Sequence, residues 1–433
     1  MSWLRNLSKP QRSALIGSTA GWGVDGFDFV LYSFVIPTLI AAWQMTRAEA
    51  GLIATGALLT SSLGGWIAGM LADRYGRVRV LQWTVIWFST CTFLSGFTNS
   101  FEQLLVIRAL QGFGFGGEWA VGAVLVSEVM DAKHRGKAVG IMQSGYAVGW
   151  ALATVTFALF FSLMPDDIAW RALFIVGILP ASLVIYLRRN VAEPEVFVKH
   201  RQSRARGTSA SPFSAIFKPG LLRTTIFASL LASGIQGAYY SVLTWLPTYL
   251  KATRNLTALN TGGYLLILIF GSFLGYLAGA FLMDHIGRRR TFVVFALLSA
   301  VTSYIYFAGN LPDAVIMFAG FPLGFAVSGM VGGFGAFLSE LFPTSVRATG
   351  QGFSYNVGRV VAASFPPLIG LLSGTYSLPS VMAAFALSSF ACVIFAALAL
   401  PETKGRKLDS VHADSHAEGD PLSGVAERAK APH

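Results

Sequence analysis

Long apolar segments, separated by short polar links, run along almost the whole chain. In a helix, about 20 consecutive apolar residues are enough to cross the hydrocarbon core of a bilayer. Twelve segments of this kind can be marked. The pattern therefore predicts an all-α membrane protein with twelve transmembrane helices, at residues 13–42, 50–71, 79–98, 102–127, 137–163, 169–187, 222–250, 261–283, 291–308, 313–338, 348–372 and 379–400.

The amino-acid composition supports the same class. Of the 433 residues, 54% are hydrophobic and only 12% are charged, whereas a soluble globular domain carries about 25% charged residues. The formal net charge is +11, and cytoplasmic loops of membrane proteins collect lysine and arginine in this way. We therefore expect the lipid bilayer, and not nucleic acid, to be the partner of this basic chain.

No sequence pattern favours an enzyme. There is no Walker motif, no cluster of metal ligands and no arrangement of a nucleophile with a base. The two cysteines, Cys91 and Cys392, lie inside apolar segments and are interpreted as packing residues. We expect neither ATP-driven pumping, nor catalysis, nor a bound cofactor.

One link is much longer than the others. Residues 188–221 are basic and serine-rich, as a polar linker is, and they divide the segments into two groups of six. The sequence thus predicts an N-terminal six-helix bundle over 1–187, a cytoplasmic linker over 188–221, a C-terminal six-helix bundle over 222–400 and a disordered cytoplasmic tail over 401–433.

The distribution of lysine and arginine predicts the orientation. With a cytoplasmic N-terminus, and with the first three residues of each segment counted with the loops, the outer loops hold four basic residues and the spans hold two, which leaves 26 of the 32 in the cytoplasm. Cytoplasmic loops carry such an excess. We therefore expect both termini to be cytoplasmic, and the short loops favour a bacterial inner membrane.

Two sequence patterns occur twice at nearly the same offset. D-x-x-G-R begins at Asp73 and again at Asp284, which is 211 positions later. S-E followed by six residues and an arginine contains Glu128 and, 212 positions later, Glu340. These repeats indicate two homologous halves, an architecture of transporters in which the substrate site lies between the halves.

The residues of the first copy resemble a known family. G-x-L-A-D-R-x-G-R-x-R at residues 69–79 matches the signature loop of the major facilitator superfamily at nearly every position, while the second copy has Ala280 in place of the first glycine. PETKG at 401–405 resembles the sugar-porter branch. RALQGFGFGGEW at 108–119 is similar to the proton-linked organic-acid, or metabolite, symporters, and DGFD at 25–28 resembles the aromatic-acid and sialate/monocarboxylate proton symporters.

The repeated loops are interpreted as a latch that holds one face of the transporter closed. An ordinary charged loop is the alternative, but the matched spacing of two copies favours a function, and the resemblance implies a gate that must break for alternating access. The expected pairs are Glu128/Arg135 and Glu340/Arg347. The predicted gate residues are Gly69, Asp73, Gly76, Arg77, Arg79, Glu128, Arg135, Asp284, Gly287, Arg288, Glu340 and Arg347.

Beyond the first three residues of each segment, five charged residues lie inside the apolar segments: Asp25, Asp28, Arg108, Glu118 and Arg359. Such residues are costly in a membrane and are functional by default. Helical rise places Asp28 about 22 Å from the cytoplasmic start of its segment and Arg108 about 9 Å from the outer start of its own. In a core of about 30 Å these depths coincide, so we expect Asp28 and Arg108 to form a buried pair.

Two interpretations of this pair stay open. It is either a permanent ion pair that orients two helices or part of a proton-coupling site, because burial and a nearby arginine act in opposite directions on the proton affinity of a carboxylate. Asp25 lies one turn deeper without an obvious partner, and it is the first choice for the residue that gains and loses the proton. Glu118 is expected either to relay protons or to pack against Gln143 or a loop arginine.

Arg359 lies about 17 Å from the cytoplasmic start of its segment, near the midplane. A guanidinium binds a carboxylate through two parallel hydrogen bonds, and no Asp or Glu lies at mid-depth in the last six segments. We therefore favour contact with an anionic substrate over a structural pair. The full predicted substrate-binding set is Arg108, Gln111, Gln236, Tyr239, Tyr240, Asn356 and Arg359.

These features predict a secondary active transporter that moves a small organic anion into the cell together with protons and functions as a monomer. The anion is a carboxylate such as a monocarboxylate, an aromatic acid or a sugar acid. One alternative is a proton-driven exporter of drugs or metabolites with the same fold, which a basic residue at mid-membrane disfavours. The other is a nutrient receptor, which normally needs a soluble partner-binding domain.

The latch interpretation predicts the effect of one substitution. Asp73→Asn removes the charge but keeps the size of the side chain, so uptake should be abolished while folding and membrane insertion stay intact. Uptake into cells and the amount of inserted protein measure the two effects. Full uptake by the variant would contradict the latch.

Overall fold

The computed structural model describes residues 2–130, 135–191, 213–309, 311–343 and 346–404. Almost all regular structure in these ranges is α-helical, as the hydrophobic pattern predicts. The α-helices are α1 (Lys9–Trp43), α2 (Arg47–Tyr75), α3 (Arg77–Ser95), α4 (Phe101–Val129), α5 (Arg135–Leu163), α6 (Asp166–Val176), α7 (Leu183–Asn190), α9 (Pro219–Thr248), α10 (Ala258–Ile286), α11 (Arg288–Ala308), α12 (Asp313–Val331), α13 (Phe334–Leu341), α14 (Arg347–Ala363), α15 (Phe365–Leu372) and α16 (Leu378–Ala399).

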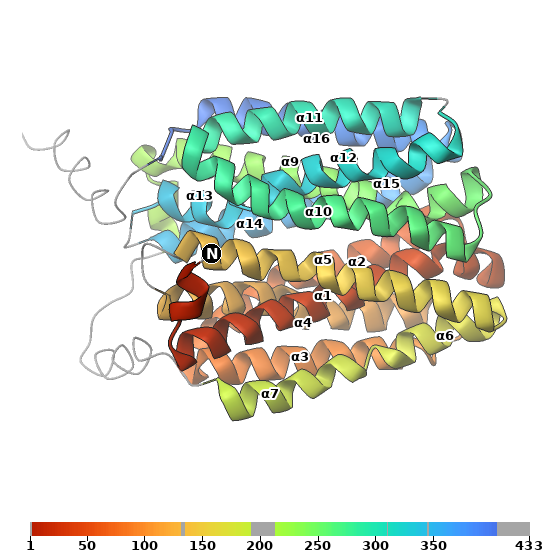
Figure 1. The fold of residues 1–433 in the computed structure, drawn as a ribbon, viewed down its shortest axis with the longest axis horizontal. Coiled ribbons are helices and arrows are strands. Elements are labelled where there is room, and N and C mark those ends of the chain that lie inside the picture. The colour runs from red at the N-terminus through yellow and green to blue at the C-terminus, as the bar shows by residue number, and fades with distance from the viewer. Residues whose placement is uncertain (1, 131–134, 192–212, 310, 344–345, 405–433) are drawn as a thin grey trace, which may run out of the picture.

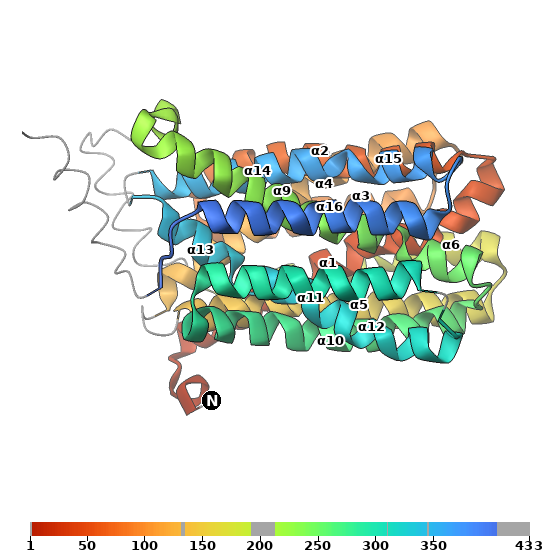
Figure 2. The same cartoon turned by 90° about the horizontal axis from the view of Figure 1, so that it is seen from above.

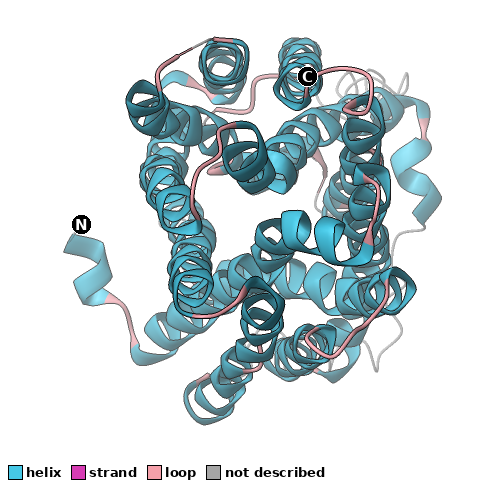
Figure 3. Cartoon of the chain, turned by 90° about the vertical axis from the view of Figure 1, so that its right-hand side faces the viewer, coloured by secondary structure: helices cyan, strands magenta, loops and turns pink. Residues whose placement is uncertain are grey.

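The helices form two groups that lie side by side (Figure 1). The N-terminal group contains α1 to α7, and the C-terminal group contains α9 to α16. The long helices of both groups run along one common direction in a second view (Figure 2), and Figure 3 looks along that direction. This is the predicted architecture of twelve spans in two bundles. We call the end that carries the N-terminus, the α2–α3 turn and the α10–α11 turn the N-terminal face.

Several predicted spans are interrupted helices. The segment at 169–187 consists of α6, the 3-10 turn η2 (Leu179–Ser182) and α7, and the segment at 348–372 consists of α14 and α15. Prolines lie at both interruptions, Pro180 in η2 and Pro366 at the start of α15, and proline removes a helical hydrogen bond. By length and composition alone, eight helices in the described ranges are able to cross a membrane.

Pro247 lies at the end of the long helix α9. The helix stops one residue later, at Thr248. The chain continues in a π-helical turn, η4 (Tyr249–Thr253). Because proline cannot donate its backbone nitrogen, the ordinary ladder of hydrogen bonds is lost here and a wider turn replaces it.

Glycines let the long helices approach one another at backbone distance. A Cβ atom at Gly149 of α5 would overlap the carbonyl oxygen of Gly23 on α1, and one at Gly116 of α4 would overlap that of Ser61 on α2. Small residues give membrane helices this close packing. The glycine-rich run of residues 112–117 therefore serves close packing between helices.

The two copies of D-x-x-G-R form the same turn. Gly76 joins α2 to α3 with φ +112°, and Gly287 joins α10 to α11 with φ +98°. An L-amino acid rarely adopts this backbone conformation, which is essentially reserved for glycine. Matched glycines with matched conformation support the internal repeat.

The turn at Gly287 generates a prediction about stability. Gly287→Ala forces an alanine into the positive-φ region and places its Cβ 2.7 Å from Glu402 Oε2, so we expect a loss of about 1 to 3 kcal/mol. The matched control is Gly263→Ala, because a Cβ there meets open space inside α10. Thermal unfolding in detergent measures both variants, and equal melting temperatures would contradict the strain at Gly287.

Candidate functional site

The five charged residues of the apolar segments are all buried. Asp25 and Asp28 lie on α1, Arg108 and Glu118 on α4, and Arg359 on α14. Each of them exposes at most 1% of its surface. Because a buried charge is costly unless it is paired, the partners of each group decide how it is held.

The Arg359 guanidinium reaches from the C-terminal group to the N-terminal group. Its Nη1 donates to the Ser61 hydroxyl of α2 at 3.3 Å, and its Nη2 donates to the Tyr355 hydroxyl at 3.0 Å. Its central carbon lies 5.1 Å from the ring centroid of Phe115 on α4 and 4.9 Å from that of Tyr355. Among the described residues, no carboxylate forms an ion pair with Arg359. Neutral oxygens and aromatic faces hold the cation instead.

Aromatic rings from both groups surround this guanidinium. Phe115 stacks on Phe29 of α1 with a centroid distance of 4.9 Å, and Phe29 contacts Tyr240 of α9 at 5.5 Å. Tyr355 stacks on Trp119 of α4 at 4.0 Å, with 9° between the ring planes. The site is therefore a set of flat apolar faces around one positive charge.

Asp25 and Glu118 approach each other across α1 and α4. Neither carboxylate has a hydrogen-bond partner among the described residues. Glu118 packs against Gly21, since a Cβ atom there would overlap its Oε1. Gly21 precedes Asp25 by four residues, so the two carboxylates lie about one helical turn apart along α1. Gln143, considered as a partner for Glu118, instead accepts a hydrogen bond from Trp119 Nε1 at 3.2 Å.

Asp28 and Arg108 are neighbours, but they do not form the direct pair that the depth count suggests. The described ion pairs do not include one between them, and neither carboxylate oxygen of Asp28 has a hydrogen-bond partner among the described residues. Arg108 Nη2 donates to the backbone carbonyl of Phe29 at 3.4 Å, and its guanidinium lies 5.3 Å from the Tyr32 ring. Depth along two helices fixes only height, whereas the direction of each side chain around its helix decides contact.

The predicted neutral residues differ in where they point. Gln236 Nε2 donates to the backbone carbonyl of Tyr355 at 2.8 Å, which leaves the Gln236 carbonyl oxygen without a partner. Asn356 donates to the carbonyl of Gly352 within its own helix. Gln111 donates to Thr92 of α3 at 2.7 Å, inside the N-terminal group. Of these three, Gln236 is the one that bonds directly to a neighbour of Arg359.

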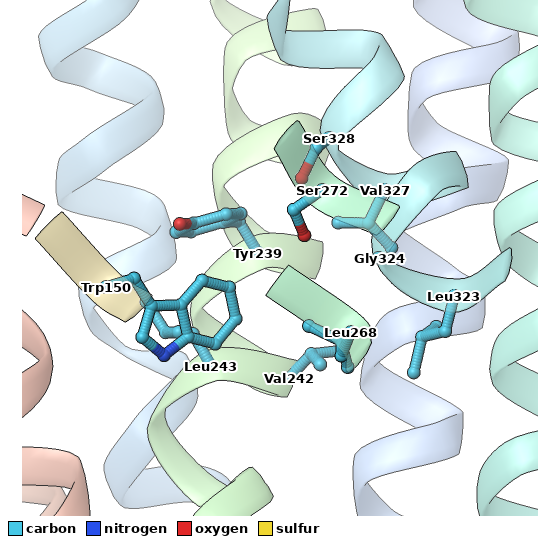
Figure 4. A pocket seen from close by; sticks show the side chains of 10 residues that line it. All are labelled: Trp150, Tyr239, Val242, Leu243, Leu268, Ser272, Leu323, Gly324, Val327 and Ser328. Atoms are coloured by element: carbon cyan, nitrogen blue, oxygen red, sulfur yellow. The ribbon is translucent and has the colours of Figure 1, made fainter. Parts of the chain in front are cut away.

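A small cavity lies beside Tyr239 (Figure 4). Its volume is about 20 Å³, enough for one water molecule and too small for an organic acid. The Tyr239 ring also contacts Tyr146 of α5 at 6.0 Å and Tyr240 at 5.8 Å. The cavity is lined by Trp150, Tyr239, Val242, Leu243, Leu268, Ser272, Leu323, Gly324, Val327 and Ser328.

At the N-terminal face, the second sequence copy forms a charged cluster within the C-terminal group. Arg288 binds Glu340 through two hydrogen bonds, Nε to Oε2 at 3.0 Å and Nη2 to Oε1 at 2.8 Å, and its Nη1 lies 3.2 Å from Asp284 Oδ1. The expected partner of Glu340 was Arg347, whose Nε donates to the Ser339 carbonyl instead. The arginine that binds Glu340 thus comes from the α10–α11 turn, which is next to Glu340 in space but 52 residues away in sequence.

Glu402 connects this cluster to the segment after α16. Its carboxylate accepts the backbone N–H groups of Arg288 and Arg289 at 2.9 and 3.1 Å, at the start of α11. Partial burial acts to raise the Glu402 pKa, but these bonds and those from Lys404 and Thr403 outweigh it and lower the pKa. The carboxylate caps α11, and the Thr403 hydroxyl donates to Glu340.

The corresponding cluster of the first copy lies mostly outside the described residues. The side chains of Asp73, Glu128 and Arg135 belong to that part, so their predicted contacts stay predictions. In the same turn, Arg77 is half-buried and Arg79 is exposed. A Cβ atom at Gly69 would meet nothing within 4 Å.

Sequence reasoning missed several ring contacts of the site. Nothing in the sequence marks four of these rings as part of a site, because each occupies an ordinary apolar position of a membrane helix. They are Phe29, Phe115, Trp119 and Tyr146. Ser61, which bonds to Arg359, is one of many serines in the spans. Only their arrangement in space distinguishes them from other core residues.

Known proteins resemble this chain along its whole length. Residues 20–281 and 267–428 match the Major Facilitator Superfamily. A probable 4-methylmuconolactone transporter of Cupriavidus pinatubonensis is 41% identical over 423 residues, which cover 98% of each chain. A cis,cis-muconate transport protein of Acinetobacter baylyi is 30% identical over 88% of this chain and 92% of that protein, and a sialic acid transporter of Escherichia coli is 28% identical over 87% and 91%.

Solved structures show the same fold. The xylose transporter XylE from Escherichia coli, in an inward-open conformation, is similar with a TM-score of 0.74 over 93% of this chain and 99% of that one. A crystal structure of a D-xylose-proton symporter has a TM-score of 0.73 over 92% and 99%. Each is 17% identical to this chain, so the likeness concerns the fold alone.

Proposed function

Because this chain belongs to the Major Facilitator Superfamily, we propose that it is a symporter that carries a small organic anion into the cell together with protons. The relatives are named as transporters, and the names of three mention 4-methylmuconolactone, cis,cis-muconate and sialic acid. These names support the class of small organic acids for this chain too. The two helical groups would take turns in opening the site to either side of the membrane.

The observation that carries this proposal is the environment of Arg359. A guanidinium stays charged at all physiological pH values, and in this structure it lies at the junction of the two groups with only neutral acceptors. A carboxylate would supply the missing negative charge and two parallel hydrogen bonds. In the proposed complex, Arg359 holds the carboxylate, and Gln236, Tyr239, Tyr240, Asn356, Gln111 and Arg108 shape the surroundings.

The rings around Arg359 favour a flat, unsaturated acid. Phe29, Phe115 and Tyr240 present apolar faces toward the same region, and aromatic faces pack well against planar π-systems. A sugar acid carries many hydroxyl groups that would need partners in such a site. Muconate, which has a conjugated planar chain, fits these surroundings better than sialic acid.

The buried carboxylates of α1 and α4 are the proposed route for protons. Asp25 and Glu118 are buried without hydrogen bonds, and an ionised carboxylate is costly in that state. Both are therefore proposed to carry protons during part of the cycle, with Asp28 tuning them under the influence of Arg108. Asp25 lies one helical turn before Phe29, which stacks on Phe115 of the Arg359 site, so an anion bound at Arg359 would change the electrostatic surroundings of Asp25.

The charged cluster at the N-terminal face is the proposed latch. Arg288, Glu340 and Asp284 form ion pairs that tie the α10–α11 turn to α13, and Glu402 and Thr403 add the segment after α16. Asp73, Arg77, Glu128 and Arg135 would form the equivalent latch of the N-terminal group. We place this face, with both termini, in the cytoplasm of a bacterial cell, and propose that a single chain in the inner membrane is the transport unit.

Transport by the purified protein in liposomes tests the function. Counterflow is measured for 4-methylmuconolactone, cis,cis-muconate, niacin, sialic acid and lactate. Each acid is tested at equal pH on both sides of the liposome membrane and with a lower pH outside. We expect exchange of at least one acid and its accumulation only with the pH gradient. Exchange of none of these acids, or accumulation that ignores the gradient, would refute the proposal, and net export driven by protons would favour an exporter.

Removing the positive charge of Arg359 should abolish tight binding of the anion. Arg359→Gln loses a charged hydrogen-bonding partner worth about 2 to 3 kcal/mol, which corresponds to a rise in KM of about 30- to 150-fold. Arg171→Gln is the matched control, because Arg171 binds Gly96, Thr98 and Asn99 at the opposite face. Counterflow measures both variants, and an unchanged KM in Arg359→Gln would remove Arg359 from the site.

Removing the acidic group of Asp25 should separate exchange from accumulation. Asp25→Asn keeps the shape of the side chain but cannot gain or lose a proton. We expect counterflow, which needs no net proton movement, to stay within about threefold of the parent, while accumulation driven by a pH gradient is lost. Accumulation at the parent level would show that another group carries the proton.

A further inference from the structure

Tyr355 touches both the buried cation and the opposite helical group. Its hydroxyl accepts a hydrogen bond from Arg359 Nη2 at 3.0 Å, while its ring lies parallel to Trp119 at 4.0 Å. Trp119 belongs to α4 and Tyr355 to α14, so the stack joins the N-terminal group to the C-terminal group. One side chain thus connects the proposed anion site to a contact between the halves.

The stack lies on the side of Arg359 that faces the N-terminal face. α14 starts at that face with Arg347, and Tyr355 precedes Arg359 by one helical turn. Other groups hold the two rings in place. Trp119 donates its indole N–H to Gln143 of α5, and Phe334 of α13 lies 6.0 Å from the Tyr355 ring.

We propose that Tyr355 is the positioning residue through which a carboxylate bound at Arg359 releases the contact between α4 and α14 on the N-terminal side of the site. This inference rests on the proposed function, because it assigns the step that follows binding of the anion. It concerns a residue that neither touches the predicted latch nor belongs to the carboxylate pair.

The physical basis is competition for the N–H groups of one guanidinium. In this structure, Arg359 donates to two neutral hydroxyls, those of Ser61 and Tyr355. Arg359 Nε has no partner in this structure, and a carboxylate takes two parallel N–H groups at once. A carboxylate bound side-on at Nε and Nη2 is a stronger acceptor than a neutral hydroxyl, so it takes Nη2 from the Tyr355 hydroxyl.

The loss of this bond weakens the stack because Tyr355 is held from two sides. The bond at its hydroxyl keeps the ring plane aligned with Trp119, and the guanidinium adds its attraction for the ring, with a distance of 4.9 Å to the centroid. The backbone of Tyr355 stays anchored, since its carbonyl accepts from Gln236. When the bond is lost, we therefore expect the Tyr355 side chain to move and the distance between the two helical groups to change, while the Tyr355 backbone stays in place.

A cysteine beside Trp119 reports whether the stack is closed. In a chain with Cys91→Ala and Cys392→Ala, Gly335→Cys on α13 places a new side chain next to Trp119, because a Cβ there lies 3.8 Å from Trp119 Cζ2 in ordinary contact. Alkylation by N-ethylmaleimide is followed in detergent, where both faces are accessible, with and without cis,cis-muconate. Size-exclusion profiles confirm that each variant is folded.

The decisive variant is Tyr355→Phe, which removes the hydroxyl and keeps the ring. In the reporter chain with Tyr355, we expect slow alkylation that cis,cis-muconate accelerates about tenfold, the effect of one hydrogen bond to a charged group. In Tyr355→Phe, alkylation should be about tenfold faster already without the acid, and the acid should add less than about twofold. Trp119→Leu should behave like Tyr355→Phe, whereas Trp119→Phe should restore most of the acid response.

A control variant removes a tyrosine hydroxyl elsewhere in the C-terminal group. Tyr264 donates its hydroxyl to the Asp313 carbonyl at the face opposite to the N-terminal face, so Tyr264→Phe should alkylate like the reporter chain. A resting rate in Tyr355→Phe within twofold of the reporter chain, or an undiminished response to the acid, would overturn the inference. If the parent transports no acid, the proposed function fails in that measurement, while the resting rates without acid still decide whether the Tyr355 hydroxyl holds the stack.

Discussion

The buried guanidinium of Arg359 sets the conditions for the centre of this protein. It lies at the junction of the two helical groups, and the described residues offer it hydroxyls and ring faces but no carboxylate in ion-pair contact. Desolvating a permanent charge is expensive, and neutral hydrogen bonds compensate only part of the cost. An anion would compensate this cost more fully than neutral groups do, and this is the physical basis of the proposed carboxylate site.

The same scarcity of partners applies to the carboxylates on α1 and α4. Asp25, Asp28 and Glu118 lack hydrogen bonds in the described structure, so their charge depends on nearby cations and on protons. Asp25 lies one helical turn before Phe29, a ring of the Arg359 site, and Asp28 directly precedes Phe29, whose carbonyl accepts from Arg108. In the proposed mechanism, a substrate that changes the charge near Arg359 also changes the proton balance of α1, and coupling needs no contact between the anion and the proton carrier.

Close helix packing makes this electrostatic arrangement possible. Glycines bring α1 against α5 and α2 against α4 at backbone distance, and the glycine at position 21 leaves room for the Glu118 carboxylate beside α1. Larger residues at these positions would separate the helices and admit lipid or water to the charges. The charged cluster at the N-terminal face follows the same rule, because Gly287 adopts a backbone conformation that brings Arg288 and Glu402 together.

The sequence by itself determined the helical class, the twelve spans, the repeat and the five buried charges, because hydrophobic periodicity, charge content and glycine positions are local properties of the chain. It also indicated Arg359 as a cation without a carboxylate of its own half. Only the tertiary structure decided which groups touch: Arg108 bonds to the Phe29 carbonyl and not to Asp28, Glu340 binds Arg288 and not Arg347, and Trp119 stacks on Tyr355. The physical reason is that position along a helix sets only the depth of a residue, whereas its contacts depend on the rotation and approach of helices that lie far apart in sequence.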